Sequence, residues 1–187
     1  MLFNMASLAG GGSIKAAEIA FNGEPSFALI RPPGHHASPD SCWGFCYFNN
    51  MGIALEKLRE EGKIDSAYVL DFDLHTGDGN INSISGKPGI KILNPTAGDR
   101  EEYLDEVASD LENSKKCDII GVSAGFDEHI EDWGGKLTTS DYKELGSMVK
   151  EFSDKKCEGR RFALLEGGYN HSVLGENVAS FVEGFRD

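Results

Sequence analysis

The chain has 187 residues, a length that suits one domain and is short for two. Hydrophobic residues make up 40% and charged residues 26%, which excludes disordered and fibrous proteins and predicts a globular one. The formal net charge of -13 argues against direct nucleic acid binding and favours cationic substrates, such as lysine-rich segments or polyamines.

The predicted elements alternate between helix and strand. Apolar residues at helical spacing after the glycine run 10–12 predict a helix, and the apolar segment 26–30 predicts a buried strand that two prolines end. The later predictions are helix 49–61, strand 67–72, strand 90–93, helix 100–113, strand 118–123, helix 140–153, strand 162–165 and helix 173–185. Helices between apolar strands imply a three-layer α/β fold, with a parallel sheet covered by helices on both faces.

No targeting segment is expected, because no apolar run approaches about 18 residues and no basic segment precedes an apolar one. These features predict a cytoplasmic protein without membrane contact. The four cysteines are few and irregularly spaced, as in reduced proteins. Cys42 and Cys46 could form half of a thiolate zinc site, but no second half has matching spacing, so free thiols are favoured.

Chemically active residues follow four of the predicted strands. In parallel sheets, active sites form where the carboxyl ends of the strands point, so these residues are expected to meet. Three of the five histidines fall in these segments. The segments are Gly34-His35-His36, Asp73-Leu74-His75, Gly125-Phe126-Asp127 and Gly167-Gly168-Tyr169.

The stretch DFDLHTGDG, residues 71–79, predicts a metal site. Alternate side chains of an extended chain project to the same side, so Asp73 and His75 can bind one ion together. Asp127 is the expected third ligand, and the position left open for water suits a hydrolytic zinc or iron(II) site. The alternative is that Asp71 and Asp73 are turn residues that cap the next helix.

Two histidine–carboxylate pairs are also expected. His35 and His36 follow a stiff Pro-Pro-Gly turn, and Asp71 and Asp78 could each fix the tautomer of one imidazole, which supplies a general base and a general acid. Tyr169 follows two glycines and could donate a hydrogen bond to a developing oxyanion. Its alternative role is that of a core aromatic residue.

Other polar residues are weaker candidates. His129 and His171 lie in polar loops, where a surface or supporting position is favoured over a catalytic one. The segment 131–132 is expected to be solvated.

Six motifs in this order resemble the zinc-dependent histone deacetylase family, which includes acetylpolyamine amidohydrolases and acetoin-utilisation proteins. The resemblance runs from about Ala6 to the C-terminus and implies an arginase-like fold. The motifs are RPPGHHA, GFCYFNN, DFDLHTGDG, VSAGFDEH followed by GGKLTTSDY, and LLEGGYN.

The resemblance implies roles for the metal-binding residues. Asp73, His75 and Asp127 would hold zinc, and carbonyl groups around Asp71, Asp73 and His75 would hold a potassium ion. Arginase-like ureohydrolases carry additional acids that bridge a second metal, but Gly77 and Gly125 stand at those positions. One metal is therefore expected.

The resemblance also implies roles in catalysis. His36 with Asp78 would be the general base and acid, and His35 with Asp71 an electrostatic partner or proton helper. Tyr169 would polarise the acetyl carbonyl. A zinc-bound water would attack the acetyl amide and release acetate and a free amine. The substrate tunnel for acetyl-lysine would be lined by Gly44 and Phe45.

Departures from the family leave alternatives open. Only 34 residues precede His35, so the single domain, residues 1–187, is expected to lack the usual N-terminal portion, and the segment between Gly79 and Asp99 is short. Substrate preference between an acetylated protein and an acetylated polyamine stays open. The rival hypothesis is a non-catalytic metal-binding module, completed through an exposed sheet edge by a homo-oligomer or a second chain.

Overall fold

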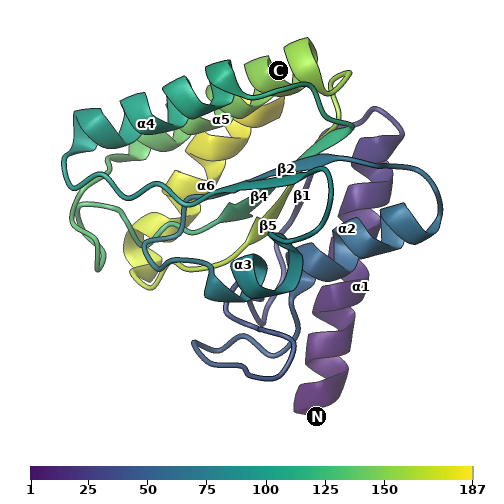
Figure 1. Cartoon of the computed structure of the whole chain (residues 1–187). Coiled ribbons are helices and arrows are strands. Elements are labelled where there is room, and N and C mark those ends of the chain that lie inside the picture. The colour runs from purple at the N-terminus through teal and green to yellow at the C-terminus, as the bar shows by residue number, and fades with distance from the viewer. Residues whose placement is uncertain (187) are drawn as a thin grey trace.

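The computed structural model describes residues 1–186, in which five strands form one sheet flanked by helices (Figure 1). All strand pairs are parallel, in the order β1-β5-β4-β2-β3, which confirms the predicted α/β class. The strands are β1 (Ser26–Ala28), β2 (Ala67–Asp71), β3 (Ile90–Leu93), β4 (Ile119–Ala124) and β5 (Arg161–Leu165). The helices are α1 (Leu2–Phe21), α2 (Asn50–Glu60), α3 (Asp78–Ile84), α4 (Arg100–Asn113), α5 (Thr139–Lys156) and α6 (His171–Arg186).

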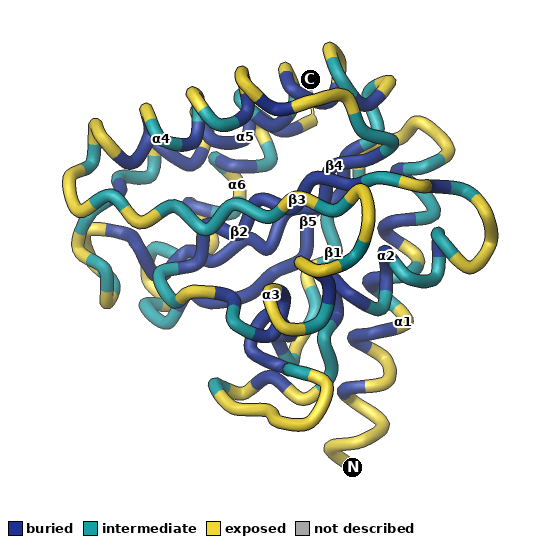
Figure 2. The backbone as a smooth tube through the Cα atoms, viewed as in Figure 1, coloured by how far each residue is buried: buried dark blue, intermediate teal, exposed yellow. Residues whose placement is uncertain are grey.

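Two hydrophobic cores cover the two faces of the sheet, because side chains alternate along each strand. On one face, α1 and α2 pack against Val69, Ile119 and Phe162. On the other face, α4, α5 and α6 pack against Leu70 and Ile120. The fold therefore has the three predicted layers, and its central strands are fully buried (Figure 2).

Helix α1 begins at Leu2 and continues through the glycine run, so the prediction of a helix only after residue 12 was wrong. A Cβ atom on Gly10 would lie 3.7 Å from Cδ1 of Ile53, which shows how closely α1 approaches α2. This packing compensates for the weak helix propensity of glycine. The buried face of α1 carries only small residues, which are Ala6, Ala9, Gly10, Ser13, Ala16, Ala17 and Ala20.

The other predicted elements are present, with boundaries that differ by a few residues. Strand β1 ends at Ala28, earlier than predicted, and α5 extends to Lys156. The short helix α3 was not predicted. Among residues 1–186, no helix combines the length and the hydropathy needed to cross a bilayer.

The start of α5 is fixed by a buried carboxylate. Asp141 accepts hydrogen bonds from the backbone N–H and the hydroxyl of Thr138, at 2.7 Å and 2.8 Å, as in a capping box. It also accepts hydrogen bonds from Nε and Nη2 of Arg100 at the start of α4. The carboxylate therefore ties two helices of one layer together.

We predict that Asp141→Ala lowers the free energy of unfolding by about 2 kcal/mol, since it removes a helix cap and a partly buried ion pair. Burial opposes ionisation, but the hydrogen bonds from Arg100 and Thr138 lower the pKa of Asp141. A lowered pKa stabilises the fold above the ordinary aspartate value of about 3.9, and this contribution is lost as the pH falls through the lowered value.

Urea unfolding of the parent and the variant between pH 7 and pH 3 would measure this contribution. The difference between them should be constant at neutral pH and shrink only at the acid end. Glu144→Ala, on an exposed position of the same helix, is the matched control. A difference that is equally large for both variants would contradict the assignment.

Candidate active site

The parallel register brings the polar segments together at the carboxyl ends of the strands. Asp71 at the end of β2 pairs with Ser123 of β4, and Ala124 pairs with Leu165 of β5. The residues that follow these ends continue side by side, and the N–H of Gly167 donates to Oδ2 of Asp73 at 2.7 Å. The predicted gathering of these segments at one edge is therefore present.

Asp73, His75 and Asp127 converge as the sequence predicted. Nδ1 of His75 lies 3.1 Å from Oδ1 of Asp73 and 3.1 Å from Oδ2 of Asp127. One potential ligand atom from each residue lies within 4.8 Å of the other two. Both acids are buried, and the histidine side chain is 33% exposed, so the group is open to solvent on the histidine side.

The electrostatics of this group favour a bound cation. Asp127 Oδ2 is buried and accepts no hydrogen bond from residues 1–186. Burial and the charge of Asp73 raise the pKa of Asp127 to about 7. Two buried carboxylates so close together are costly unless positive charge compensates them, and a divalent metal supplies that charge. Carboxylate and imidazole ligands suit zinc or iron(II).

Three glycines leave room for the carboxylates. A Cβ atom on Gly167 would lie 2.5 Å from Oδ2 of Asp73 and 2.7 Å from Oδ2 of Asp127. On Gly125 it would lie 2.2 Å from Oδ2 of Asp73, and on Gly77 it would lie 2.0 Å from Oδ2 of Asp71. A side chain at any of these three glycines would therefore collide with a carboxylate.

Both expected histidine–carboxylate pairs are present. Nδ1 of His36 lies 2.6 Å from Oδ1 of Asp78. Nδ1 of His35 lies 3.3 Å from both carboxylate oxygens of Asp71, which also accepts a hydrogen bond from the Asn80 amide at 3.0 Å. The centroids of the two imidazole rings are 4.0 Å apart, and both residues are buried.

The two histidines have pKa values that move in opposite directions. Burial lowers the pKa of His35, but the charge and hydrogen bond of Asp71 outweigh it and raise the value well above the ordinary one. Burial and the neighbouring His35 lower the pKa of His36. Divergent values in adjacent titratable groups are typical of an acid and base pair.

Tyr169 is held beside the metal-ligand group. Its backbone N–H donates to Oδ2 of Asp132 at 2.8 Å, and its ring stacks on Trp133 with centroids 3.9 Å apart. Trp133 in turn lies edge-on to His75 at 5.9 Å. Asp132 was expected to be solvated, but its carboxylate anchors the Tyr169 loop. This contact is long-range, and no local sequence signal identifies it.

A second tryptophan lies over the histidine pair. The indole of Trp43 stacks on His36 with centroids 3.8 Å apart, and its Nε1 donates to Oδ2 of Asp78 at 2.9 Å. A Cβ atom on Gly44 would lie 2.5 Å from Cδ2 of His36, so the backbone passes directly against this ring. Phe45 is 66% exposed beside it. Sequence analysis did not select Trp43.

Glu166 holds the backbone of the loop that carries His35 and His36, and the sequence did not predict this role. Its Oε2 accepts from the backbone N–H groups of Gly34 and His35, at 2.7 Å and 3.1 Å. His35, Cys46 and Glu166 form a second group of potential metal ligands. Burial raises the pKa of Cys46, which keeps its thiol protonated, and raises that of Glu166 to about 7. A protonated thiol is a poor metal ligand, which favours structural support over metal binding here.

The remaining two histidines lie outside the group. His129 is buried and stacks on Tyr142, while its Nδ1 accepts from the backbone N–H of Glu131 at 3.2 Å. His129 therefore has a supporting position, which is one of the two kinds of position, surface or supporting, that were expected for it. His171 is exposed at the start of α6.

A comparison with known protein families identifies the family of this chain. A family model described as the histone deacetylase domain matches residues 1–95 and 93–185. The chain belongs to the histone deacetylase family. Histone deacetylases as a family are metal-dependent, in agreement with the candidate ligand group.

Individual relatives agree with this classification. A probable deacetylase of Archaeoglobus fulgidus is 35% identical over 207 residues, which cover 90% of this chain and 57% of the relative. A chloroplastic histone deacetylase of Oryza sativa is 31% identical and covers 85% and 44%. The crystal structure of an acetylpolyamine aminohydrolase from Burkholderia pseudomallei is 26% identical, with a TM-score of 0.77 and coverage of 95% and 61%. This deacetylase-family chain thus spans less than two thirds of each.

We predict that Gly167→Ala weakens metal binding at least tenfold, because the added methyl group would displace the carboxylates of Asp73 and Asp127. Titration calorimetry with zinc would measure the affinity, and circular dichroism would check the fold. Gly175→Ala is the matched control, since its Cβ atom would meet nothing within 4 Å. Equal zinc affinities for both variants and the parent would refute the proposed ligand group.

Proposed function

We propose that this chain is a metal-dependent amidohydrolase that removes acetyl groups from acetyl-lysine or related N-acetylated amines. The observation that carries the proposal is the placement of two histidine–carboxylate pairs directly beside the convergent Asp73, His75 and Asp127. Membership of the histone deacetylase family supports the reaction class.

The metal would be held by the three convergent side chains. Their fit rests on the buried Oδ2 of Asp127, which accepts no hydrogen bond from residues 1–186, and on the glycines that leave both carboxylates unobstructed. A zinc ion there would act as a Lewis acid toward water and the acetyl carbonyl. Zinc and iron(II) both suit this ligand set, and a potassium ion near the backbone of Asp71 stays a prediction.

His36 is proposed as the general base and acid. Its Nδ1 faces a carboxylate that can only accept, so Nδ1 carries the proton and Nε2 is free to receive one from the attacking water. Addition of that water to the acetyl carbonyl, followed by proton return to the amide nitrogen, breaks the C–N bond. Acetate and a free amine are the products.

His35 and Tyr169 would stabilise developing charge. His35 is held between Asp71 and Asp73, with its Nε2 3.7 Å from Oδ1 of Asp73, which suits an electrostatic role. Tyr169 keeps its phenol protonated because burial raises its pKa, so it can donate a hydrogen bond to the carbonyl oxygen.

Two tryptophans support an aliphatic substrate stem. Trp43 over His36 and Trp133 over Tyr169 flank the metal-ligand group, and they are 53% and 63% exposed. Indole faces suit both methylene groups and ammonium groups. They therefore fit acetyl-lysine and acetylated polyamines, and the net charge of -13 favours the cationic ends of either. Gly44 and Phe45 are proposed to extend the Trp43 side of this opening.

We predict that His36→Ala and Tyr169→Phe each reduce acetate release at least about a hundredfold, since each removes a group that acts on the reacting atoms. Acetate would be measured with zinc-loaded protein, and zinc stoichiometry would be determined for every variant. His171→Ala is the matched control at an exposed site. Full activity in both variants would contradict the roles, whereas a zinc-loaded parent without any activity would favour a non-catalytic module.

We predict that Trp133→Ala raises KM at least about tenfold while Trp133→Phe recovers most of it, because an aromatic face is retained. Steady-state kinetics on an acetyl-lysine peptide and an acetylated polyamine, side by side, would measure this effect and identify the preferred substrate. A fall in kcat alone, with KM unchanged, would instead assign Trp133 to positioning Tyr169.

The cellular context of the proposed activity is still a prediction. A cytoplasmic location was expected from the sequence. One relative is named as chloroplastic, so the compartment of this chain stays a prediction. Homo-oligomerisation, completion by a second chain and the absence of nucleic acid binding are likewise predictions.

A further inference from the structure

Two cysteines lie side by side at the end of the sheet opposite the metal-ligand group. Cys117 lies just before β4 and Cys157 just after α5, and both are free thiols. Their Sγ atoms are 3.2 Å apart, although the residues are 40 positions apart in sequence. A disulfide joins sulfurs at about 2.05 Å, so the pair is roughly one ångström from bonding distance.

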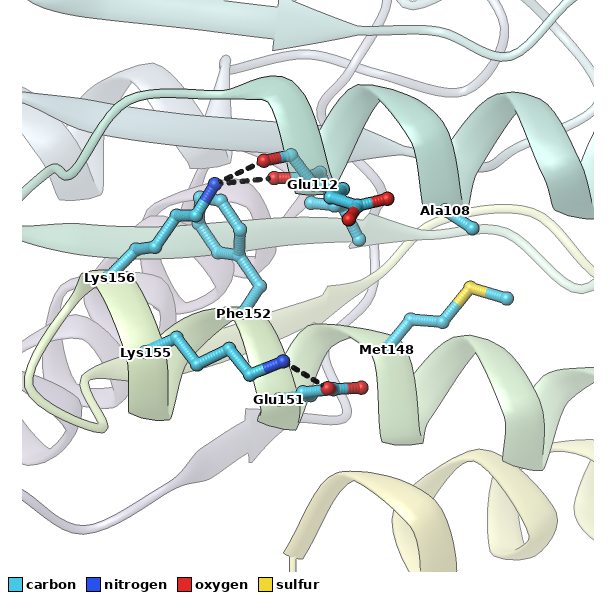
Figure 3. Close-up of a pocket in the computed structure, with 8 residues that line it drawn as sticks. Ala108, Glu112, Met148, Glu151, Phe152, Lys155 and Lys156 are labelled. Carbon is cyan, nitrogen blue, oxygen red and sulfur yellow. Dashed lines mark hydrogen bonds and ion pairs between the residues drawn. The ribbon is translucent and has the colours of Figure 1, made fainter.

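The backbone around both residues is fixed by hydrogen bonds. The N–H of Cys117 donates to the carbonyl of Lys156 at 3.1 Å, and the N–H of Arg160 donates to the carbonyl of Cys157 at 2.9 Å. The ammonium group of Lys156 donates to the carbonyl of Glu112 at the end of α4, at 2.6 Å (Figure 3). These hydrogen bonds hold the two backbone segments beside each other and keep the two thiols close together.

One of the two thiols is accessible and the other is enclosed. Cys117 is partly exposed and lines an open cavity of about 420 Å³, whereas Cys157 is 1% exposed. The hydrogen bond with Cys157 lowers the pKa of Cys117, although burial opposes this effect. Thiolates are the nucleophiles in disulfide exchange, so a small oxidant would react first at Cys117. The charged side chains that line the cavity are of both signs: Lys116, Lys155, Lys156 and Arg160, together with Asp118, Asp154 and Glu158.

We propose that Cys117 and Cys157 form a reversible intramolecular disulfide, with a low-molecular-weight disulfide such as glutathione disulfide as the oxidant. The Cys117 thiolate attacks one glutathione sulfur, forms a mixed disulfide and releases one glutathione thiolate. The Cys157 thiol then loses its proton, attacks Sγ of Cys117 and releases the second glutathione. Two protein thiols are oxidised while one glutathione disulfide is reduced to two thiols.

The disulfide would tie the end of α5 to the start of β4. The metal-ligand group lies beyond the opposite end of β4, roughly 20 Å away along a six-residue strand. A cross-link between two residues 40 positions apart restricts the unfolded chain, so oxidation should stabilise the protein. It should leave the proposed hydrolysis unchanged, because the metal-ligand group is remote.

The direct test incubates the folded 187-residue chain in glutathione buffers of increasing oxidation, followed by acid quenching, thiol alkylation and peptide mass spectrometry. The expected result is a peptide pair linked through Cys117 and Cys157, reversed by excess glutathione. Thermal unfolding of the oxidised protein should occur at a temperature about 5 °C or more above that of the reduced protein.

Two single variants separate the steps. Cys157→Ser should trap the mixed glutathione disulfide on Cys117, whereas Cys117→Ser should leave Cys157 reduced, because it is enclosed. Cys42→Ser is the matched control at an exposed cysteine, and it should form the link and gain stability as the parent does.

Three outcomes would overturn the proposal. The first is the absence of the linked peptide under conditions that fully modify Cys42 with glutathione. The second is a glutathione adduct that persists on Cys117 in the parent. The third is a linked protein that unfolds at a lower temperature than the reduced one, which would show that the native fold resists the bond.

Discussion

The structure depends on a concentration of buried negative charge at the carboxyl ends of its central strands. Asp71, Asp73, Asp127 and Glu166 are at most 5% exposed, and they come from three strand ends that the parallel register places side by side. Ionised groups in such an environment need compensation. Backbone N–H groups donate to Oε2 of Glu166, whose Oε1 accepts no hydrogen bond from residues 1–186, and His35 compensates Asp71. Asp127 accepts a hydrogen bond from the backbone N–H of Leu74, but its buried Oδ2 accepts none, so a cation beside the other two side chains would stabilise its charged form.

The same constraint explains the surrounding layers of polar contacts. Asn80 and the backbone of Gly167 hold carboxylates in place, and glycines occupy the positions where any side chain would collide with them. Asp132 accepts a hydrogen bond from the backbone of the Tyr169 loop, and the indole N–H of Trp43 donates to Asp78, the carboxylate that pairs with His36. Each group with a proposed catalytic role is thus oriented by a neighbour, as the proposed hydrolysis would require.

The strands and the convergence of Asp73, His75 and Asp127 could be predicted from sequence because their signals are local. Apolar runs mark the strands, and the rule for parallel sheets places the residues that follow them. Helix α1 was predicted to start too late, because tight packing of its small residues against α2 outweighs the propensity of its glycines. Asp132, Glu166 and the two tryptophans depend on partners far away in sequence, which no local pattern reveals.

The central claim is that Asp73, His75 and Asp127 bind a single divalent metal. Anomalous diffraction above and below the zinc absorption edge, from crystals of the full chain grown with zinc, tests it most directly. One strong peak is expected within about 2.0–2.2 Å of an atom from each of the three side chains. Zinc found only at other positions, or a second zinc bridged by the same acids, would show that the three side chains do not hold a single metal.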